Sequence, residues 1–162
     1  MTNKQILESE AKSRLSALCA QRERCSYEMI EKMQHWELPE EAQARIMQYL
    51  TEHKFIDDER YARAVSIDKL RYNKWGRKKI EQALWHKHID NDIIVSVLDE
   101  IDDDEYLSVL RPLLQSKRRS TKGKSEYEIN QKLIRFAFSR GYEYRLIRLC
   151  IGDADEDALV GL

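Results

Sequence analysis

The chain has 162 residues, 42% of them hydrophobic and 35% charged, which is the composition of a soluble protein rich in helices. No stretch approaches the roughly 18 consecutive apolar residues of a membrane span, and the N-terminus lacks the apolar core of a signal peptide, so we expect a cytoplasmic protein with no membrane partner. The formal net charge of −1 argues against a protein that coats nucleic acid through charge alone.

The first third of the chain is predicted to form three helices. Apolar residues at helical spacing predict the first helix over residues 4–22 and the second over residues 26–36. Pro39 and the two glutamates after it mark the start of the third helix, because proline is tolerated in a first turn and acids are favourable at a helix N-terminus. This helix should continue to about Lys54.

The middle third contains the clearest local pattern in the chain. In the segment IDDERY at residues 56–61, the first aspartate can cap a helix and the isoleucine can pack against the tyrosine. The fourth helix should therefore start here and run to about Tyr72. Gly76 is expected to open a fifth helix, and the pair Ile89-Asp90 repeats the same arrangement before a sixth.

After an acidic run, a seventh helix is predicted from Asp104 to about Lys117. Pro112 falls inside this helix, where proline removes one backbone hydrogen bond and clashes with the preceding turn. The helix should therefore be kinked there or begin near Arg111. Residues 115–124, with the sequence QSKRRSTKGK, hold no apolar residue and one glycine, which predicts a mobile basic loop.

Two further helices complete the predicted set of nine. The sequence SEYE at residues 125–128 is typical of a capping box, in which the first and fourth residues satisfy each other's backbone amides, and it should open the eighth helix. Gly141 is expected to end that helix, and a ninth should follow to about Ile151. Residues 155–162 are expected to be a frayed acidic tail.

Apolar positions recur along the chain with a period of about 50 residues. Three sets of seven apolar residues keep the same internal spacing, 4-5-4-4-1-3, and begin at Met29, Ile80 and Leu133. Helical periodicity explains the steps of four, but it does not explain the same turn length between two helices three times. A period of this length is typical of helical repeat proteins, in which each unit buries its apolar face against its neighbour.

The predicted fold class is therefore all-α. We expect three tandem three-helix repeats that form an elongated, curved and twisted array, and such arrays usually present an extended surface to a partner. The expected repeats cover residues 1–56, 57–101 and 102–154, the third with its basic loop near 115–124.

Catalysis, metal binding and cofactor binding are not expected. The sequence has no GxSxG, no Walker glycine loop, no HExxH and no dinucleotide-binding glycine motif. His86 and His88 are two residues apart and would point to different sides of a helix, so they cannot share a metal ion. The aspartates at 102–104 lack the spaced ligands of a calcium loop and are better explained as helix caps. The odd number of cysteines, without a CxxC pair, favours buried thiols.

Two basic clusters are the candidate binding residues. The first surrounds the joint between the fourth and fifth helices and includes the aromatic residues Tyr72 and Trp75, whereas the second lies on the predicted loop. Cations beside flat aromatic rings suit phosphates with stacked bases or an acidic protein groove; a solvated surface, with Trp75 covering an end of the core, is the alternative. The first cluster consists of Arg71, Lys74, Arg77, Lys78 and Lys79. The second consists of Lys117, Arg118, Arg119, Lys122 and Lys124.

The order of several short motifs resembles that of the RecX family of regulatory proteins. Residues 54–62, KFIDDERYA, are similar to the family pattern G-[YF]-[LI]-[DN]-D-x-[RK]-[FY]-A, except that Lys54 replaces the glycine. Further matches begin at Arg22 (R…E-M-x-x-K-M), Gly76 (G-x-x-x-I-x-x-x-L) and Lys132 (K-x-x-R-F…R-G-Y), and they follow the family's order over nearly the whole chain. The matched signature residues, which look mainly structural, are Asp57, Asp58, Arg60, Tyr61, Gly76, Arg135, Phe136, Gly141 and Tyr142.

A second departure from the family pattern lies at Lys87-His88, where the family commonly has Lys-Gly, and both departures allow the turns to differ locally. The resemblance implies a regulator, not an enzyme, that binds the RecA filament on single-stranded DNA and inhibits its ATPase and strand-exchange activity in recombination, DNA repair and the SOS response. RecA is the implied partner, single-stranded DNA within the filament is a further candidate, and we expect a monomer. A helical-repeat module that binds nucleic acid directly, without RecA, stays open as an alternative.

Overall fold

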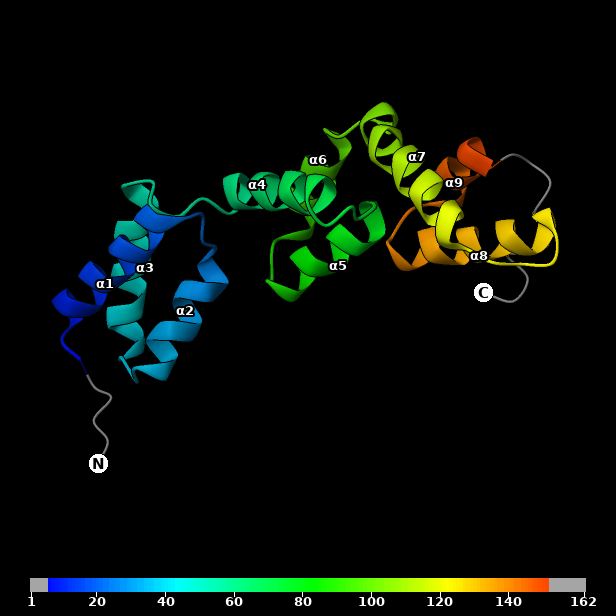
Figure 1. Ribbon diagram of the computed structural model, residues 1–162. Helices are drawn as coiled ribbons and strands as arrows, with labels where there is room; N and C mark the ends of the chain where they lie inside the picture. The colour runs from blue at the N-terminus through cyan, green and yellow to red at the C-terminus, as the bar shows by residue number, and fades with distance from the viewer. Residues whose placement is uncertain (1–5, 152–162) are drawn as a thin grey trace. The chain divides into compact units, whose positions relative to one another are not determined.

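The computed structural model describes residues 6–151, and every regular element in this range is an α-helix (Figure 1). The predicted all-α fold is confirmed. None of the helices in the described range is long and apolar enough to cross a membrane. The helices are α1 (Glu8–Gln21), α2 (Ser26–His35), α3 (Glu40–Glu52), α4 (Asp58–Arg71), α5 (Arg77–His86), α6 (Asn91–Asp99), α7 (Asp103–Ser120), α8 (Glu126–Ser139) and α9 (Tyr144–Ile151).

The predicted start of the first helix is wrong. Leu7 precedes α1 and has the extended backbone of a residue just before a helix, with φ −68° and ψ 148°. Glu8 and Glu10 lie in the first turn of α1, where the positive end of the helix dipole stabilises acids. Residues 4–5, which were also predicted to be helical, lie outside the described range, as does the predicted tail at 155–162.

Helix α7 continues through residues that were predicted to form a loop. It ends at Ser120, so the predicted basic loop at 115–124 is wrong for its first six residues, and residues 121–125 alone separate α7 from α8. Lysine, arginine and glutamine are good helix formers, and the basic residues at 117–119 are favourable at the negative C-terminal end of the helix. Pro112 lies inside the helix on its exposed side, where water can bond the carbonyl that proline leaves unpaired.

Packing divides the described chain into two compact units. Unit 1 consists of residues 6–65 and 84–95, and unit 2 consists of residues 66–83 and 96–151. The division falls within α4, α5 and α6, so each of these helices contributes residues to both units. The boundaries of three separate repeats, and their elongated, curved arrangement, stay predictions.

In unit 1, α3 packs against both α1 and α2 around an apolar core (Figure 1). The helices bury the residues that recur at helical spacing, and each fully buried leucine or methionine contributes roughly 1.5–3 kcal/mol. The buried members of this core are Ala11, Leu15, Met29, Met33, Leu38, Ile46, Leu50 and Ile56.

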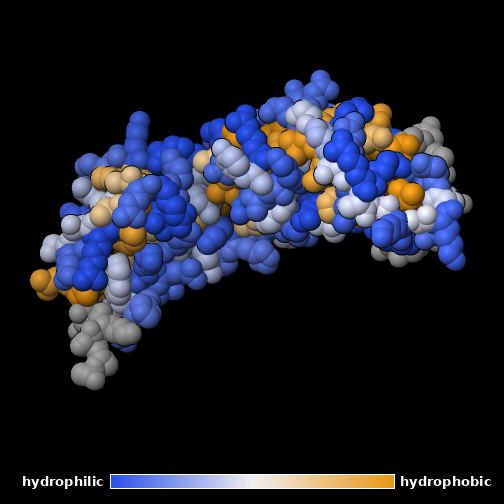
Figure 2. All heavy atoms as spheres, in the orientation of Figure 1, coloured by the Kyte–Doolittle hydropathy of each residue, from blue (hydrophilic) through white to orange (hydrophobic). Residues whose placement is uncertain are grey.

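In unit 2, α7 packs against both α8 and α9, and these two helices also pack against each other (Figure 1). Their buried side chains include Leu110, Leu133 and Ile147, each at most 1% exposed. Hydrophilic residues predominate on the face shown in Figure 2, with apolar residues visible between them.

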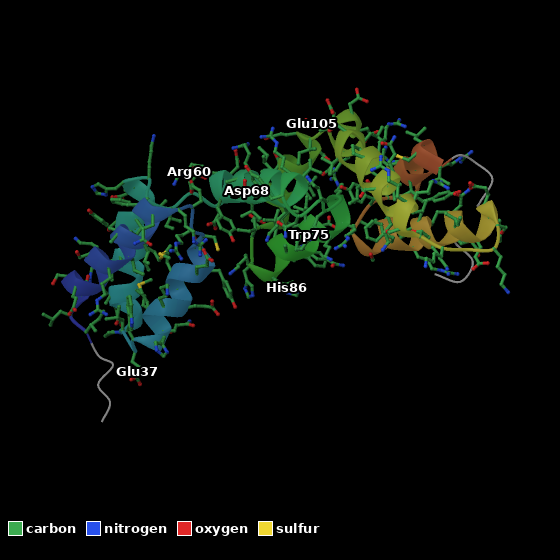
Figure 3. All side chains as sticks on the ribbon, in the orientation of Figure 1. Glu37, Arg60, Asp68, Trp75, His86 and Glu105 are labelled. Atoms are coloured by element: carbon green, nitrogen blue, oxygen red, sulfur yellow. The ribbon has the colours of Figure 1, made fainter. Side chains whose placement is uncertain are left out.

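The turn between the second and third helices of each predicted repeat has the same backbone geometry. Glu37, His88 and Gly141 occupy corresponding positions and have left-handed φ values of 58°, 55° and 95°; Glu37 is labelled at the first of these turns in Figure 3. In each case the amide of the next residue donates to the carbonyl five residues before it, at 3.1–3.2 Å. This is the hydrogen bond of a Schellman cap, and its recurrence supports a structural repeat.

The recurring apolar positions are core positions. Of the 20 that lie in the described range, 16 are buried and none is exposed. The last position of the pattern, Ala154, lies outside that range. The four half-buried positions are Met47, Ile93, Cys150 and Ile151.

Candidate partner-binding surface

The start of α5 is held against the turn between α8 and α9, within unit 2. The Gly76 amide donates to the Arg140 carbonyl at 2.7 Å, and the Lys78 amide donates to the Gly141 carbonyl at 3.0 Å. A Cβ atom at Gly76 would lie 2.6 Å from backbone atoms of Gly141 and Tyr142, so only glycine allows the two backbones to approach this closely. This contact brings the first basic cluster next to the end of α8.

Two cations of the first cluster, Arg77 and Lys79, contact other helices of unit 2. Arg77 forms an ion pair with Asp99 at 2.8 Å, and its side chain is only 27% exposed. Lys79 places its ammonium group 4.9 Å from the centre of the Trp75 ring and 3.3 Å from the Ser139 carbonyl. The charge of Arg77 is therefore neutralised by Asp99, whereas no carboxylate within residues 6–151 forms an ion pair with Lys79.

The other members of the first cluster, Arg71, Lys74 and Lys78, are exposed. The Lys74 ammonium donates to the Arg71 carbonyl at 2.7 Å, which leaves its charge available. Lys69 lies outside the predicted cluster, yet its ammonium is 5.0 Å from the centre of the Trp75 ring. Trp75, at the joint between α4 and α5 (Figure 3), is thus approached by two lysines.

In the second cluster, Arg118 has a structural role. Its guanidinium group contacts Glu126 at 3.2 Å and Asn130 at 2.7 Å, which ties the end of α7 to α8. The Lys117 ammonium lies 4.9 Å from the centre of the Phe136 ring. The remaining members of the cluster are exposed, and they are Arg119, Lys122 and Lys124.

The last turn of α8 joins the two clusters into one surface. Arg140 lies 4.8 Å from the centre of the Phe136 ring, which Lys117 also approaches. The neighbouring carbonyl of Ser139 accepts the hydrogen bond from Lys79. We name this surface the basic–aromatic strip. It consists of Lys69, Trp75, Lys79, Phe136, Arg140 and Lys117, all in unit 2.

Sequence reasoning did not include Lys69 and Arg140 among the binding residues, and it assigned Phe136 a mainly structural role. A local pattern indicates one of these contacts, because Arg140 follows Phe136 by four residues, the spacing at which helical side chains meet. No local pattern places Lys117 on the same ring, 19 residues earlier in the chain. Arg135, a signature residue, is exposed on α8 and has no contact with the strip among those described.

Asp102 and Asp103, at the start of α7, act as a cap and as an ion-pair partner. Asp102 accepts a hydrogen bond from the Glu105 amide at 2.9 Å and caps α7. Asp103 pairs with Arg145 at 2.5 Å, and the hydrogen bond from this arginine lowers the pKa of Asp103. Both aspartates line a hollow of about 520 Å³ that holds charges of both signs. Among residues 6–151, no group of three or more His, Cys, Asp or Glu side chains is placed to hold a metal ion.

Two family models match the chain. The model described as the second three-helix domain of RecX matches residues 57–98, and that described as the third three-helix domain of RecX matches residues 103–151. Together they cover more than half of the chain. The chain belongs to the RecX family.

Individual RecX proteins are similar over much of this chain. A regulatory protein RecX from Clostridium perfringens (strain 13 / Type A) is 33% identical over 119 residues, which are 72% of this chain and 55% of that protein. One from Lactobacillus johnsonii is 29% identical over 132 residues, 82% of this chain and 49% of that protein. The chain thus spans about half the length of these curated relatives. The crystal structure of RecX from Lactobacillus salivarius has the same fold, with a TM-score of 0.80 at 20% identity over 89% of this chain and 94% of that one.

The RecX signature at the start of α4 connects this helix to α2. The Asp57 carboxylate accepts a hydrogen bond from the Arg60 amide at 3.0 Å and caps α4, as its sequence position predicts. The Asp58 carboxylate accepts one from the Ser26 amide at 2.8 Å, so it caps α2 as well as lying in the first turn of its own helix. Arg60, labelled in Figure 3, pairs with Glu23 at 2.7 Å. These contacts stabilise unit 1 and engage the charged groups of Asp57, Asp58 and Arg60.

Proposed function

We propose that this RecX chain binds the RecA filament on single-stranded DNA and inhibits its ATPase and strand-exchange activities. The observation that carries the proposal is the basic–aromatic strip on a chain that belongs to a family of regulatory proteins. Such a role belongs to recombination and the response to DNA damage, and it takes place in the cytoplasm.

The strip has charges that attract an anionic partner. Lys69, Lys79 and Lys117 lie beside aromatic rings, and no carboxylate of residues 6–151 forms an ion pair with them. Attraction of such cations to phosphates or acidic side chains is screened by salt. The rings of Trp75 and Phe136 supply flat apolar surface for a base or for an aliphatic stem. Binding should therefore be strong at low salt and weaken as salt rises.

An ATPase assay of RecA on single-stranded DNA, run at two salt concentrations, tests the proposal. Adding this protein should lower the ATPase rate, and the inhibition should weaken at the higher salt concentration. The strip variant combines Lys79→Gln, Lys117→Gln and Arg140→Gln. It should need about tenfold more protein for half-maximal inhibition if the three contacts together contribute about 1.4 kcal/mol.

A control variant combines Lys12→Gln, Arg45→Gln and Arg63→Gln. It removes the same charge from unit 1 and leaves the strip intact, so its inhibition should equal that of the unchanged protein. Equal loss of inhibition in the strip and control variants would contradict the strip as the contact surface. Absence of any effect of the unchanged protein on the RecA ATPase would contradict the function itself.

Direct binding of nucleic acid without RecA is the second candidate. It is favoured by Tyr72, which is 79% exposed at the same joint as Trp75, because exposed aromatic side chains stack on unpaired bases. Fluorescence anisotropy with a labelled oligo-dT and no RecA distinguishes the two candidates. Tight binding that the strip variant loses, together with an unchanged RecA ATPase rate, would favour direct binding.

A further inference from the structure

A second charged surface lies within unit 1. It is a hollow of about 390 Å³ between the link from α1 to α2, one face of α2 and the turn that follows α5. Of its eight lining residues, four carry a positive charge and two carry a negative charge. The argument for a ligand depends on which of these charges the protein itself already pairs.

Both acids of the hollow are engaged. The Glu28 carboxylate accepts hydrogen bonds from the Cys25 amide and from the Lys87 ammonium, each at 3.1 Å. Burial acts to raise the pKa of Glu28, but these two hydrogen bonds, together with the nearby positive charges of Lys87 and Arg22, outweigh it and lower the pKa. Glu28 therefore stays ionised and neutralises Lys87. Glu31 accepts a hydrogen bond from the Tyr27 hydroxyl, and this bond raises the pKa of Tyr27.

Three cations of the hollow have no carboxylate in ion-pair contact within the described range. Arg22 donates to the backbone carbonyl of Glu23 at 3.4 Å, and Arg24 donates to the carbonyl of Leu18 at 3.3 Å. Lys32 lines the same hollow from α2. A backbone carbonyl carries no net charge, so these contacts orient the arginines without neutralising them.

The walls of the hollow are fixed by contacts between α2 and the turn after α5. The Cys25 thiol lies 3.9 Å from the Lys87 carbonyl, and the rings of Tyr27 and His88 stack with their centres 4.0 Å apart. Lys87 is therefore held at both its backbone and its ammonium group. A site that is fixed before binding loses less conformational entropy when its ligand arrives.

We propose that this hollow binds an acidic peptide segment of a partner protein, with Arg22, Arg24 and Lys32 holding two or more of its carboxylates. An arginine side chain matches a carboxylate with two parallel hydrogen bonds. Glu31 on the wall repels a phosphate that is fixed in the main chain of a nucleic acid, whereas the flexible side chains of a peptide can place their carboxylates away from Glu31. The hollow shares no residue with the basic–aromatic strip, so the experiments that test the RecA proposal and this proposal are independent of each other.

Fluorescence anisotropy with a fluorescein-labelled hexaglutamate peptide and the full chain tests this site. The hollow variant, Arg22→Gln with Arg24→Gln and Lys32→Gln, should bind the peptide about tenfold more weakly, the loss expected when about 1.4 kcal/mol is removed. The control variant with Lys12, Arg45 and Arg63 changed to Gln removes the same charge from unit 1 and should bind within about twofold of the unchanged protein. Circular dichroism melting checks that both variants are folded.

The fluorescence of Trp36, which lines the hollow, places the bound peptide. The chain has three tryptophans, so Trp75→Phe with Trp85→Phe leaves Trp36 alone. Its emission should change on saturation with hexaglutamate, and the change should disappear when the hollow variant is added to this background. An oligo-dT of equal charge should compete about tenfold less well than unlabelled peptide.

Four results would overturn the proposal. They are absence of hexaglutamate binding by the unchanged protein, equal weakening in the hollow and control variants, constant Trp36 emission, and competition by oligo-dT equal to that of the peptide. The last of these would assign the hollow to nucleic acid. A failure of the RecA ATPase assay alone would leave the hexaglutamate result unaffected.

Discussion

At the scale of single residues, four side chains within residues 6–151 occupy left-handed backbone positions that favour glycine, and two of them replace a glycine of the RecX pattern. Lys54 has a φ of 61° and His88 a φ of 55°, and the RecX pattern commonly has glycine at each place. The left-handed region destabilises a residue with a side chain by roughly 1–2 kcal/mol. The turn after α3 nevertheless closes, with the Phe55 amide donating to the Leu50 carbonyl at 2.9 Å. These departures from the family pattern change the residue and keep the left-handed turn.

Restoring glycine at the first of these positions should stabilise the protein. Lys54→Gly removes the strain at the left-handed position, while the greater freedom of glycine in the unfolded chain offsets part of the gain, so we expect the free energy of unfolding to rise by up to about 1 kcal/mol. Urea denaturation measures the change. Thr51→Gly, at a helical position of α3 one turn earlier, is the control and should lower the free energy of unfolding by about 0.5–1 kcal/mol. A loss of stability in Lys54→Gly would show that the left-handed turn is not strained.

At the scale of elements, α7 shows how packing overrides a local pattern. The helix begins at Asp103 and continues through Pro112, rather than starting near Arg111. Its buried side chains lie on both sides of the proline in sequence, and each contributes roughly 1.5–3 kcal/mol, which together exceed the roughly 3 kcal/mol that proline costs in a helix interior. They are Tyr106, Leu107, Leu110 and Leu114.

Replacing this proline should strengthen α7. Pro112→Ala restores one backbone hydrogen bond and removes a clash, so we expect the free energy of unfolding to rise by about 1–3 kcal/mol, less the roughly 0.4–1 kcal/mol by which proline restricts the unfolded chain. Thermal and urea unfolding measure the gain. Ser116→Ala, on the exposed side one turn later, is the matched change without a proline and should add at most about 0.5 kcal/mol. Equal gains in the two variants would mean that Pro112 imposes no cost.

The local sequence specified the helices better than it specified the candidate surfaces. The caps at Asp57 and Ser125 could be predicted because their hydrogen bonds reach an amide only three residues away. Lys79 and the Ser139 carbonyl are 60 residues apart, and Lys87 and Glu28 are 59 residues apart. Nothing in the local pattern selects such distant partners. The strip and the hollow therefore appear only once the packing is known.

At the scale of the whole molecule, both units bury side chains that can lose a proton at alkaline pH. Unit 1 buries the Cys25 thiol and the Tyr61 hydroxyl, and unit 2 buries the hydroxyls of Tyr106 and Tyr142. Burial raises the pKa of Cys25 to about 11 and that of Tyr106 to about 12, and it also raises the pKa values of Tyr61 and Tyr142. The Tyr106 hydroxyl has no hydrogen-bond partner within the described part of the chain. All four groups are uncharged near neutral pH, so they do not weaken the folded state there.

Alkaline pH should destabilise the protein because of these groups. In the unfolded chain, cysteine loses its proton near pH 8.5 and tyrosine near pH 10. Above those values the unfolded chain binds fewer protons than the folded one, so the free energy of unfolding falls as pH rises towards the folded pKa values. For Tyr106 the loss should develop between about pH 10 and the folded pKa of about 12. Below about pH 8 the stability should not depend on these groups.

The variant Tyr106→Phe isolates one of these contributions. Near neutral pH it should leave the stability unchanged or slightly raised, since the hydroxyl that it removes has no hydrogen-bond partner among residues 6–151. Tyr142→Phe is the matched control, because its hydroxyl donates to the Lys74 carbonyl at 3.1 Å, and it should lower the free energy of unfolding by about 1 kcal/mol. Urea denaturation at pH 7, 10 and 11 should show a shallower alkaline loss for Tyr106→Phe than for the unchanged protein. The same alkaline slope in both would mean that Tyr106 titrates alike in the folded and unfolded chain, and that burial does not hold its proton.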